Sequence, residues 1–453
     1  MIPLRISSAG PALSPEVRII DDWVRTEFTA LNRAILSGAT PAPALRARVA
    51  AAVLPALPAP ADLDATAARQ LVVLVGLVAA ALARYRQEAD SCPPEHSLSD
   101  LRLPAGGPDL PTYFTALADR TGVGHPPRDS YTSLVRWNVP RVAAHWRTAG
   151  GGPAGTAAMD GCFPDHLVRT YTGNAAEESF FVLIKQGEVL EQGANRLLAP
   201  LAAGDLRFGD PAAVARVHAA TALLHTLRRL FGDYPRLPGG HAMTPAHFMD
   251  VFRQYAAHWR TGDLPPSGAF DTEAIVRDLR LGTLGPDGAA GIRRLYPGLL
   301  AHERVALDRL LDARPLTARL LDEVGVPADA LPGLPPVALA RLAAAHPALS
   351  AWYGLLSAHA RVSSAHFGLA RRMLFKPQEA REVSHRAGTP LVDNSRGTTG
   401  MTERYLLELT RRRQRHPLEA LRTAVSTARP ADADRPDPHT EVVVTVAGRS
   451  DYR

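Results

Sequence analysis

The sequence predicts a mainly α-helical protein, and three observations lead to that fold class. Apolar residues recur at three- and four-residue spacing over most of the chain. Regular alternation of apolar and polar residues, which marks half-buried strands, is nearly absent. Prolines stand at the starts of helical stretches, as Pro211 does after Asp210 and Pro245 after the capping residue Thr244.

The predicted helices follow one another from the N-terminal region to the last part of the chain. They cover residues 16–36, 43–57, 66–88, 177–201, 211–231, 245–260, 299–321, 336–345, 348–375 and 402–427. Residues 70–85 are the most apolar run, and they are fewer than the ~20 residues that a membrane span needs. We therefore interpret this run as a buried core helix and expect no membrane association.

Three segments without helical periodicity divide the chain. Residues 91–112 are rich in Pro, Gly, Ser and Asp, residues 148–160 look like a flexible loop, and residues 440–447 are β-prone but have no obvious partner. We expect an N-terminal helical subdomain (1–90), a linker region (91–121), a main helical domain (122–427) and an extended C-terminal tail (428–453). The tail would be ordered only against the body or a neighbouring subunit, which leaves a homodimer open.

Composition excludes several classes of protein. Cys92 and Cys162 are the only cysteines, too few for a disulfide framework or a thiolate-held metal site, so a reduced, cytoplasmic protein is expected. The N-terminal residues lack a continuous apolar signal segment. The net charge of +6 comes from arginines scattered among acids. Even the densest group, residues 411–415 (RRRQR), is interpreted as a solvated helix face, so no nucleic acid is expected.

Common local motifs give no support to nucleotide or hydrolase chemistry. Residues 150–155 (GGGPAG) match the spacing GxGxxG, but neither an entering strand nor a leaving helix is predicted there, and Pro153 lies inside the motif. No GxxxxGK[ST], HExxH, GxSxG or CxxC occurs.

One predicted helix carries two histidines on the same face. His359 and His366 lie seven residues apart within residues 352–375 (WYGLLSAHARVSSAHFGLARRMLF). Small residues surround His366, so a flat cofactor has room to approach the backbone there. A haem held by one imidazole keeps an open position for O2. An ordinary core histidine is the alternative for His366, and His359 is expected in the core or near a haem propionate.

The order of several segments resembles the indoleamine 2,3-dioxygenase superfamily. The likeness spans about residues 122–424. It includes the SAHFGLARRMLFKPQ helix, the Gly/Thr-rich turn RGTTGMTERY (396–405), the RTYTG segment (169–173) with the helix that follows it, and TPAHFMDVFRQYAAHW (244–259). The pairs Pro126-Pro127-Arg128 and Trp137-Asn138 are similar to the branch that contains monodechloroaminopyrrolnitrin synthase.

The resemblance implies a haem b cofactor and a set of site residues. His366 matches the axial ligand of the haem iron. Arg253 matches the arginine that receives a substrate carboxylate, a role suited to its planar fork. The other implied residues are Phe248 and Phe180 as aromatic walls, Thr398 and Thr399 beside the substrate, Trp259 next to the haem, and Arg361 as a propionate partner. Arg253 could instead be a surface residue, Phe248 and Trp259 core residues, and the two threonines a loop end with a helix cap.

Some features depart from the resemblance. Ile184 or a neighbour stands where mammalian-type members have a distal serine, residues 265–269 (PPSGA) replace a Gly/Ser/Ala-rich loop, and Ser363 replaces an arginine. No distal acid or base is therefore visible, and no catalytic residue is assigned beyond the haem iron.

We expect a haem-dependent oxidoreductase that uses O2 on an aromatic, tryptophan-like amino acid, with a link to secondary metabolism and antibiotic biosynthesis. The sequence does not choose between dioxygenation, hydroxylation, rearrangement and N-oxidation. A haem sensor or carrier without turnover is the second hypothesis. A haem-free helical interaction protein is the third.

Overall fold

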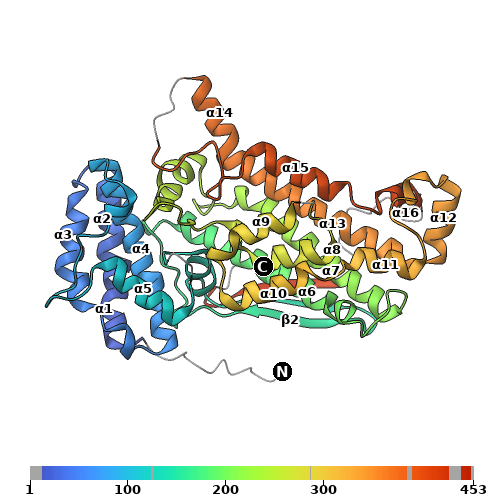
Figure 1. Cartoon of the computed structure of the whole chain (residues 1–453), viewed down its shortest axis with the longest axis horizontal. Coiled ribbons are helices and arrows are strands. Elements are labelled where there is room, and N and C mark those ends of the chain that lie inside the picture. Colours follow the sequence, from blue (N-terminus) through green and yellow to red (C-terminus); the bar gives the residue numbers. More distant parts are fainter. Residues whose placement is uncertain (1–12, 124–126, 286, 385–389, 428–439, 450–453) are drawn as a thin grey trace.

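The computed structural model describes residues 13–123, 127–285, 287–384, 390–427 and 440–449. Over these residues the chain is mainly α-helical with one small sheet, so the predicted fold class is confirmed (Figure 1). The molecule is elongated, with its N-terminal helices at one end (Figure 1).

The N-terminal helices surround a long apolar helix. They are α1 (Pro15–Trp23), η1 (Val24–Phe28), α2 (Thr29–Leu36), α3 (Pro43–Arg48), η2 (Val49–Val53), η3 (Leu54–Ala56), η4 (Pro60–Asp62) and α4 (Ala65–Asp90). Asp64 caps α4 by accepting a hydrogen bond from the Ala67 backbone N–H at 2.7 Å. By length and composition α4 could cross a membrane, but 83% of its most apolar window is buried inside the protein. It is a core helix, and its core is continuous with that of the main body.

The prediction that residues 91–121 form a linker is wrong for residues 110–121, which form a helix. After η5 (Pro94–His96), α5 (Leu110–Thr121) packs on α4 and buries Tyr113, Phe114 and Leu117. Asp109 caps this helix by accepting from the Thr112 backbone N–H at 2.9 Å. Because the residues before this helix are rich in Pro and Gly, the capping residue Asp109 was not recognised as the start of a helix.

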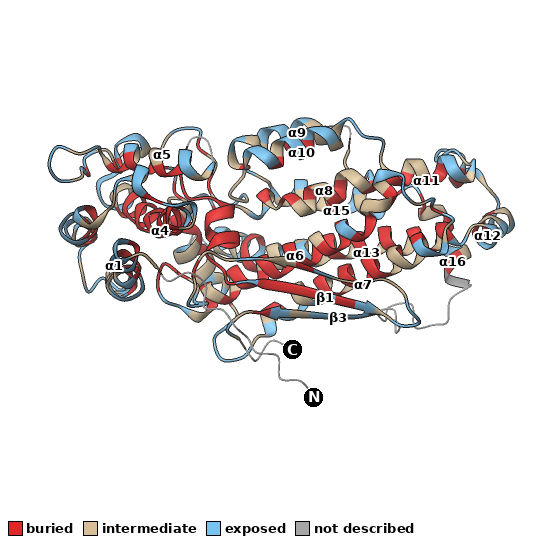
Figure 2. Ribbon diagram, turned by 90° about the horizontal axis from the view of Figure 1, so that it is seen from below, coloured by how far each residue is buried: buried red, intermediate tan, exposed pale blue. Residues whose placement is uncertain are grey.

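The main body is built around three long helices, α6 (Ala175–Ala203), α7 (Pro211–Asp233) and α13 (Pro347–Ala370). α7 packs extensively against both of the others. Figure 2 shows their buried faces meeting in the middle of the molecule. Phe208, just before α7, lies 5.4 Å from Trp352 near the start of α13, and Phe231 lies 5.7 Å from His366 near the other end. α7 and α13 therefore run in the same direction.

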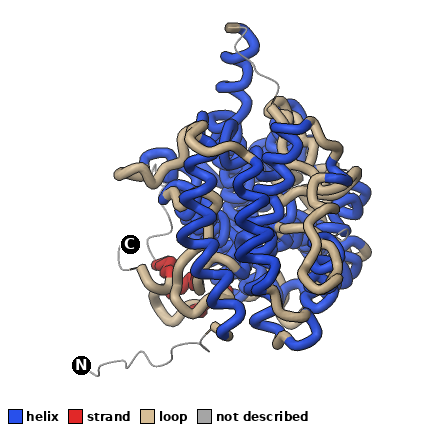
Figure 3. The backbone as a smooth tube through the Cα atoms, turned by 90° about the vertical axis from the view of Figure 1, so that its left-hand side faces the viewer, coloured by secondary structure: helices blue, strands red, loops and turns tan. Residues whose placement is uncertain are grey.

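Shorter elements complete the helical body. They are η6 (Thr132–Trp137), η7 (Tyr234–Arg236), η8 (His247–Phe252), η9 (Arg253–Ala256), η10 (Gly268–Phe270), α8 (Thr272–Leu281), α9 (Gly288–Leu295), η11 (Tyr296–Gly298), α10 (Ala301–Leu311), α11 (Leu316–Val324), η12 (Leu331–Gly333), α12 (Pro336–Ala345), η13 (Arg371–Phe375), α14 (Lys376–Val383), α15 (Glu403–Gln414), η14 (Glu419–Leu421) and α16 (Arg422–Thr427). α14 projects from the body (Figures 1 and 3).

Three predicted helices are shorter than expected. The helix predicted over 245–260 ends at Ala256, because the Asp263 carboxylate accepts from the Trp259 backbone N–H at 2.8 Å and Arg128 donates to the Ala257 carbonyl at 3.2 Å. The helix predicted over 299–321 is broken before Pro315, and the one over 402–427 before Pro417. A proline disfavours helical backbone in the residue before it, and this explains both breaks.

The sheet corrects two further predictions. Residues 148–160 are not a flexible loop, because β1 (Val142–Thr148) and β2 (Ala154–Met159) form an antiparallel hairpin across them. The β-prone tail also has a partner: β3 (Thr440–Val446) pairs antiparallel with β1 on its other edge, with Trp146 opposite Val442. The sheet lies against α6 and α7. The rest of the predicted tail, residues 428–439 and 450–453, lies outside the described residues.

Candidate functional site

His366 projects from the last part of α13 on the face that also carries Leu369 and Met373. Its imidazole is solvent-accessible, yet the surrounding protein lowers its pKa by burial. The charge of Arg413 acts in the same direction, and Glu191 opposes it. The side chain is exposed and packs beside the Phe231 ring of α7. It is neutral at pH 7, the form that binds iron.

An aromatic cluster stands beside His366. It consists of Phe180, Phe231, Tyr234, Phe248 and Phe252, and Leu369 and Met373 of the His366 face pack against it. The Phe231 ring lies 5.7 Å from the imidazole, and the Phe180 ring lies 5.7 Å from that of Phe248 and 5.4 Å from that of Phe252. The structure thus brings Phe180 and Phe248, both predicted as aromatic walls, to one apolar cluster next to the predicted axial ligand.

His359 occupies a different environment from His366. It is fully buried, its Nδ1 accepts from the Arg277 Nε–H at 2.9 Å, and its Nε2 lies 2.9 Å from Asp278. Arginine can only donate, so the proton of the neutral ring sits on Nε2. Burial lowers the pKa of His359 to about 4. His359 is therefore a hydrogen-bonded core histidine.

Arg413 is an important residue that the sequence analysis missed. It pairs with Asp278 through Nε at 3.0 Å and donates from Nη1 to the Ser363 hydroxyl at 2.8 Å. The prediction that residues 411–415 form a solvated helix face is therefore wrong for Arg413, whose side chain points toward Asp278 and Ser363. A guanidinium from α15 thus contacts Ser363, the residue that replaces an arginine in the resemblance.

Arg253 holds the loop that precedes α15. Its Nη2 donates to the backbone carbonyl of Asp393 at 2.8 Å and to that of Arg396. Among the described residues, Nε is buried without a partner and Nη1 makes no hydrogen bond. Burial lowers the pKa of Arg253 to about 10, although Asp393 opposes the shift. Arg253 is thus a buried cation without a side-chain carboxylate partner, and it is not a surface arginine.

Thr398 and Thr399 lie at the tip of the same loop. Gly397 and Met401 close the turn with a 2.7 Å backbone hydrogen bond, and both threonines are half-buried. Gln254 also holds this loop, because it accepts from the Val392 backbone N–H at 2.9 Å. These hydrogen bonds hold the loop that contains the Gly/Thr-rich turn against Arg253 and Gln254. The actual cap of α15 is Thr402, which accepts from the Tyr405 backbone N–H.

The other segments that carry the resemblance also contact one another. Asn138 donates to the Arg169 carbonyl at 2.7 Å and accepts from the Arg169 backbone N–H at 2.8 Å. The Glu177 carboxylate accepts from the Tyr171 backbone N–H at 2.9 Å and lies 3.0 Å from His247. These contacts connect Trp137-Asn138, RTYTG and the 244–259 segment. Of the Pro126-Pro127-Arg128 motif, Pro126 lies outside the described residues.

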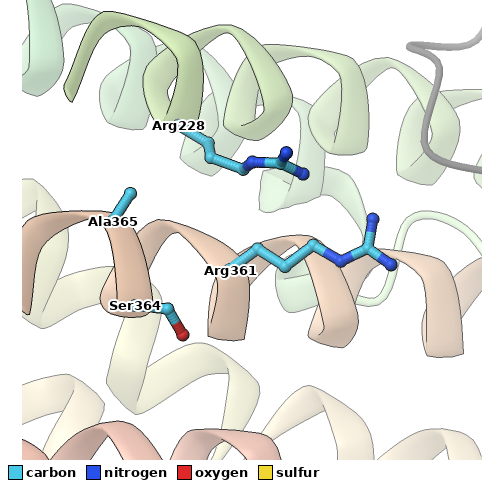
Figure 4. Close-up of a pocket in the computed structure, with 4 residues that line it drawn as sticks. All are labelled: Arg228, Arg361, Ser364 and Ala365. Atoms are coloured by element: carbon cyan, nitrogen blue, oxygen red, sulfur yellow. The ribbon is translucent and has the colours of Figure 1, made fainter. Parts of the chain in front are cut away.

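Trp259 and Arg361 are not brought to the aromatic cluster. Trp259 packs edge-on against Phe114 at 5.2 Å, under the guanidinium of Arg128. Its ring neighbours are thus Phe114 of α5 and Arg128. Arg361 precedes His366 by five residues, or about 140° around a helix of 3.6 residues per turn, and so leaves α13 from another face. It lines an open pocket of about 450 Å³ with Ser364, Ala365 and Arg228 of α7 (Figure 4).

Two findings concern the chemistry of the site and its relatives. Among the described residues no group of three or more His, Cys, Asp or Glu side chains could hold a metal ion. Comparison of the chain with protein-family models gives no match, and comparison with curated proteins gives none either.

Proposed function

We propose that the chain is a cytoplasmic, haem-dependent oxygenase that acts with O2 on an aromatic, tryptophan-like amino acid in secondary metabolism. The observation that carries the proposal is the accessible imidazole of His366 beside the aromatic cluster. The residues fit haem, because a neutral imidazole suits the iron and apolar aromatic walls suit a porphyrin. Iron protoporphyrin would supply the O2 chemistry when bound.

The side chains of this protein bind the haem and orient the substrate. His366 would hold the haem iron, and Phe231 restricts the rotation of the His366 ring by packing beside it. Phe180, Phe248 and Phe252 form an apolar wall that excludes water from an aromatic substrate. The amino acid's carboxylate binds the Nε–H and Nη1–H of Arg253, which have no partner among the described residues. Thr398 and Thr399 close the pocket from the loop that Arg253 holds.

His366→Ala tests the proposal most directly. Wild-type protein supplied with haem is expected to give a Soret band and a ferrous–CO spectrum, and His366→Ala to bind haem at least about tenfold more weakly, with added imidazole restoring the spectrum. His302→Ala, which removes an exposed histidine of α10, is the matched control and should behave as wild type. Equal haem loading in wild type and His366→Ala would refute the ligand assignment.

A specific observation supports the second candidate, a haem sensor or carrier without turnover. Arg253 already uses Nη2 on two backbone carbonyls, so loop anchoring alone could account for its position. That function predicts a haem spectrum that no aromatic amino acid perturbs, together with no O2 consumption. Titration of the ferric protein with tryptophan and tyrosine derivatives separates the two functions.

A further inference from the structure

Two buried tyrosines stack face to face where α4 meets the main body. The rings of Tyr171 and Tyr255 lie 4.0 Å apart at an angle of 4°, and they are 3% and 1% exposed. The Tyr255 hydroxyl lies 3.1 Å from the hydroxyl of Tyr85 in α4, which is also buried. A phenol gives up an electron far more easily than a phenyl ring. The three tyrosines therefore form a group that can be oxidised away from water.

Ring contacts connect this pair to the aromatic cluster beside His366. Phe252 of the cluster lies 6.0 Å from Tyr171 and 5.4 Å from Phe180. Phe231 belongs to the same cluster and packs beside His366 at 5.7 Å. Phenylalanine is itself hard to oxidise, so Phe252 is a bridge across which an electron passes between Tyr171 and the cluster.

An oxidised phenol also loses its proton, and Asp129 offers Tyr171 an acceptor. Asp129 is fully buried, and its Oδ1 accepts from the Arg128 Nε–H at 2.9 Å. Its Oδ2 has no hydrogen-bond partner among the described residues, which is unusual for a buried carboxylate. Burial raises the pKa of Tyr171 well above its ordinary value, and the charge of Asp129 adds to the shift. Burial also raises the pKa of Asp129 to about 6, although Arg128 opposes it, so the carboxylate is ionised at pH 7 yet binds a proton readily.

Tyr255 stands in a less favourable field for losing an electron. The Arg84 guanidinium lies 4.7 Å from the centre of its ring. A cation over a ring is attracted to the electrons of that ring, and it disfavours their loss. The oxidised state of the stacked pair is therefore expected on Tyr171.

From these contacts we infer that Tyr171 is a redox-active tyrosine that donates one electron to an oxidant formed in the aromatic cluster. The inference rests on the proposed function, because the oxidant is of the class that peroxide forms with haem. The Tyr171 O–H bond breaks, its electron reduces the oxidant by one equivalent, and its proton goes to Asp129. A neutral phenoxyl radical remains, and a one-electron reductant such as ascorbate restores the phenol as Asp129 returns the proton. The pair thus removes an oxidant that forms when no aromatic amino acid is bound.

Photo-oxidation of the full-length, haem-free protein tests the tyrosine pair by itself. Flash-generated ruthenium(III) tris-bipyridine removes single electrons, and the sample is frozen after a delay in which radicals on exposed tyrosines decay. Electron paramagnetic resonance should then show a tyrosyl radical that Tyr171→Phe loses, although this variant keeps the stacked ring. Tyr405→Phe removes the phenol of a tyrosine that is 49% exposed, and it should leave the signal unchanged.

Two further variants make the assignment specific. Asp129→Asn removes the proton acceptor and should shorten the lifetime of the radical, with circular dichroism to confirm folding. Tyr234→Phe removes the competing phenol of the aromatic cluster, and it should leave the signal in place. An absent signal in wild type, an equal signal in Tyr171→Phe, or a signal lost in Tyr234→Phe instead would each overturn the assignment.

The connection to haem is tested separately. Haem-loaded protein mixed with hydrogen peroxide should give the same Tyr171-dependent signal, and tryptophan added beforehand should diminish it. Protein that takes up no haem would refute the proposed function, while photo-oxidation would still decide whether Tyr171 is redox-active. Loaded protein that gives no Tyr171 signal with peroxide would overturn the electron transfer from Tyr171 to the cluster.

Discussion

Two roles are open to Arg253, binding of a substrate carboxylate and anchoring of a loop. The resemblance implies a carboxylate receptor, and the structure shows a guanidinium that anchors a loop through one nitrogen and leaves two nitrogens without a hydrogen bond among the described residues. Gln254 anchors the same loop without a charge, and so offers a control that isolates the electrostatic role.

We predict that Arg253→Leu weakens binding of an aromatic amino acid by about 30-fold or more, as expected for the loss of a buried charge partner. Spectroscopic titration of the haem-loaded protein measures the effect. Gln254→Leu should weaken binding far less, although it also loosens the loop. Similar losses in both variants would assign Arg253 to loop anchoring alone.

His359 supports a prediction about pH. The pKa of His359 is about 4 in the folded protein and 6.5 in the unfolded chain, so between these values the unfolded chain binds the extra proton. The free energy of unfolding therefore falls as pH drops from 6.5 to 4, by about 2–3 kcal/mol from this residue. Urea denaturation across this range should show the slope in wild type and a smaller slope in His359→Gln. An unchanged slope in the variant would contradict the assignment.

Among the site residues, Phe180 and Phe248 were expected from the resemblance alone, whereas the spacing of His359 and His366 singled out one histidine helix. The two phenylalanines lie in the aromatic cluster whose Phe231 ring packs beside His366. Arg413 was not predictable, because its importance depends on contacts across helices that no local pattern encodes. In a chain this rich in arginine, the residue does not stand out.

At the level of elements, long helices were predicted better than strands. The hairpin was missed because β1 and β2 are rich in alanine, which carries little strand propensity, and because the turn glycines indicate a loop. β3 has strong β propensity, but its partner lies about 300 residues earlier in the chain, and no local pattern indicates such a pairing.

α6 contacts α7 and the hairpin at one glycine, which yields a packing prediction. A Cβ on Gly193 would meet Leu223 of α7 at 3.0 Å and Trp146 of β1 at 3.1 Å. We expect Gly193→Ala to lower the free energy of unfolding by about 1–3 kcal/mol through overpacking. Gly368→Ala in α13, where space is open, should raise it by up to about 1 kcal/mol through helix propensity. Urea denaturation compares the two, and stabilisation by Gly193→Ala would contradict this account.

At the scale of the whole molecule, the C-terminal strand completes the body. β3 pairs with β1 along its full length, and Arg449 pairs with Glu178 of α6. Removing β3 would expose the edge of β1 and part of α7 to solvent.

We therefore expect a chain truncated after residue 427 to unfold at a temperature lower by roughly 5 °C or more. Scanning calorimetry measures the change, and size-exclusion chromatography should show association through the exposed strand edge. A peptide of residues 436–453 added in trans should restore much of the loss. An unchanged unfolding temperature would mean that β3 contributes little to the stability of the body.

The position of β3 also sets an order of events during synthesis. Thr148 of β1 and Thr440 of β3 are 292 residues apart, and their hydroxyl groups lie 3.1 Å from each other in the finished fold. At a translation rate of about 5–20 residues per second, the edge of β1 waits about 15–60 s before its partner leaves the ribosome. The nascent chain must keep that edge from pairing elsewhere for this whole interval, until the synthesis of β3 allows the sheet to close.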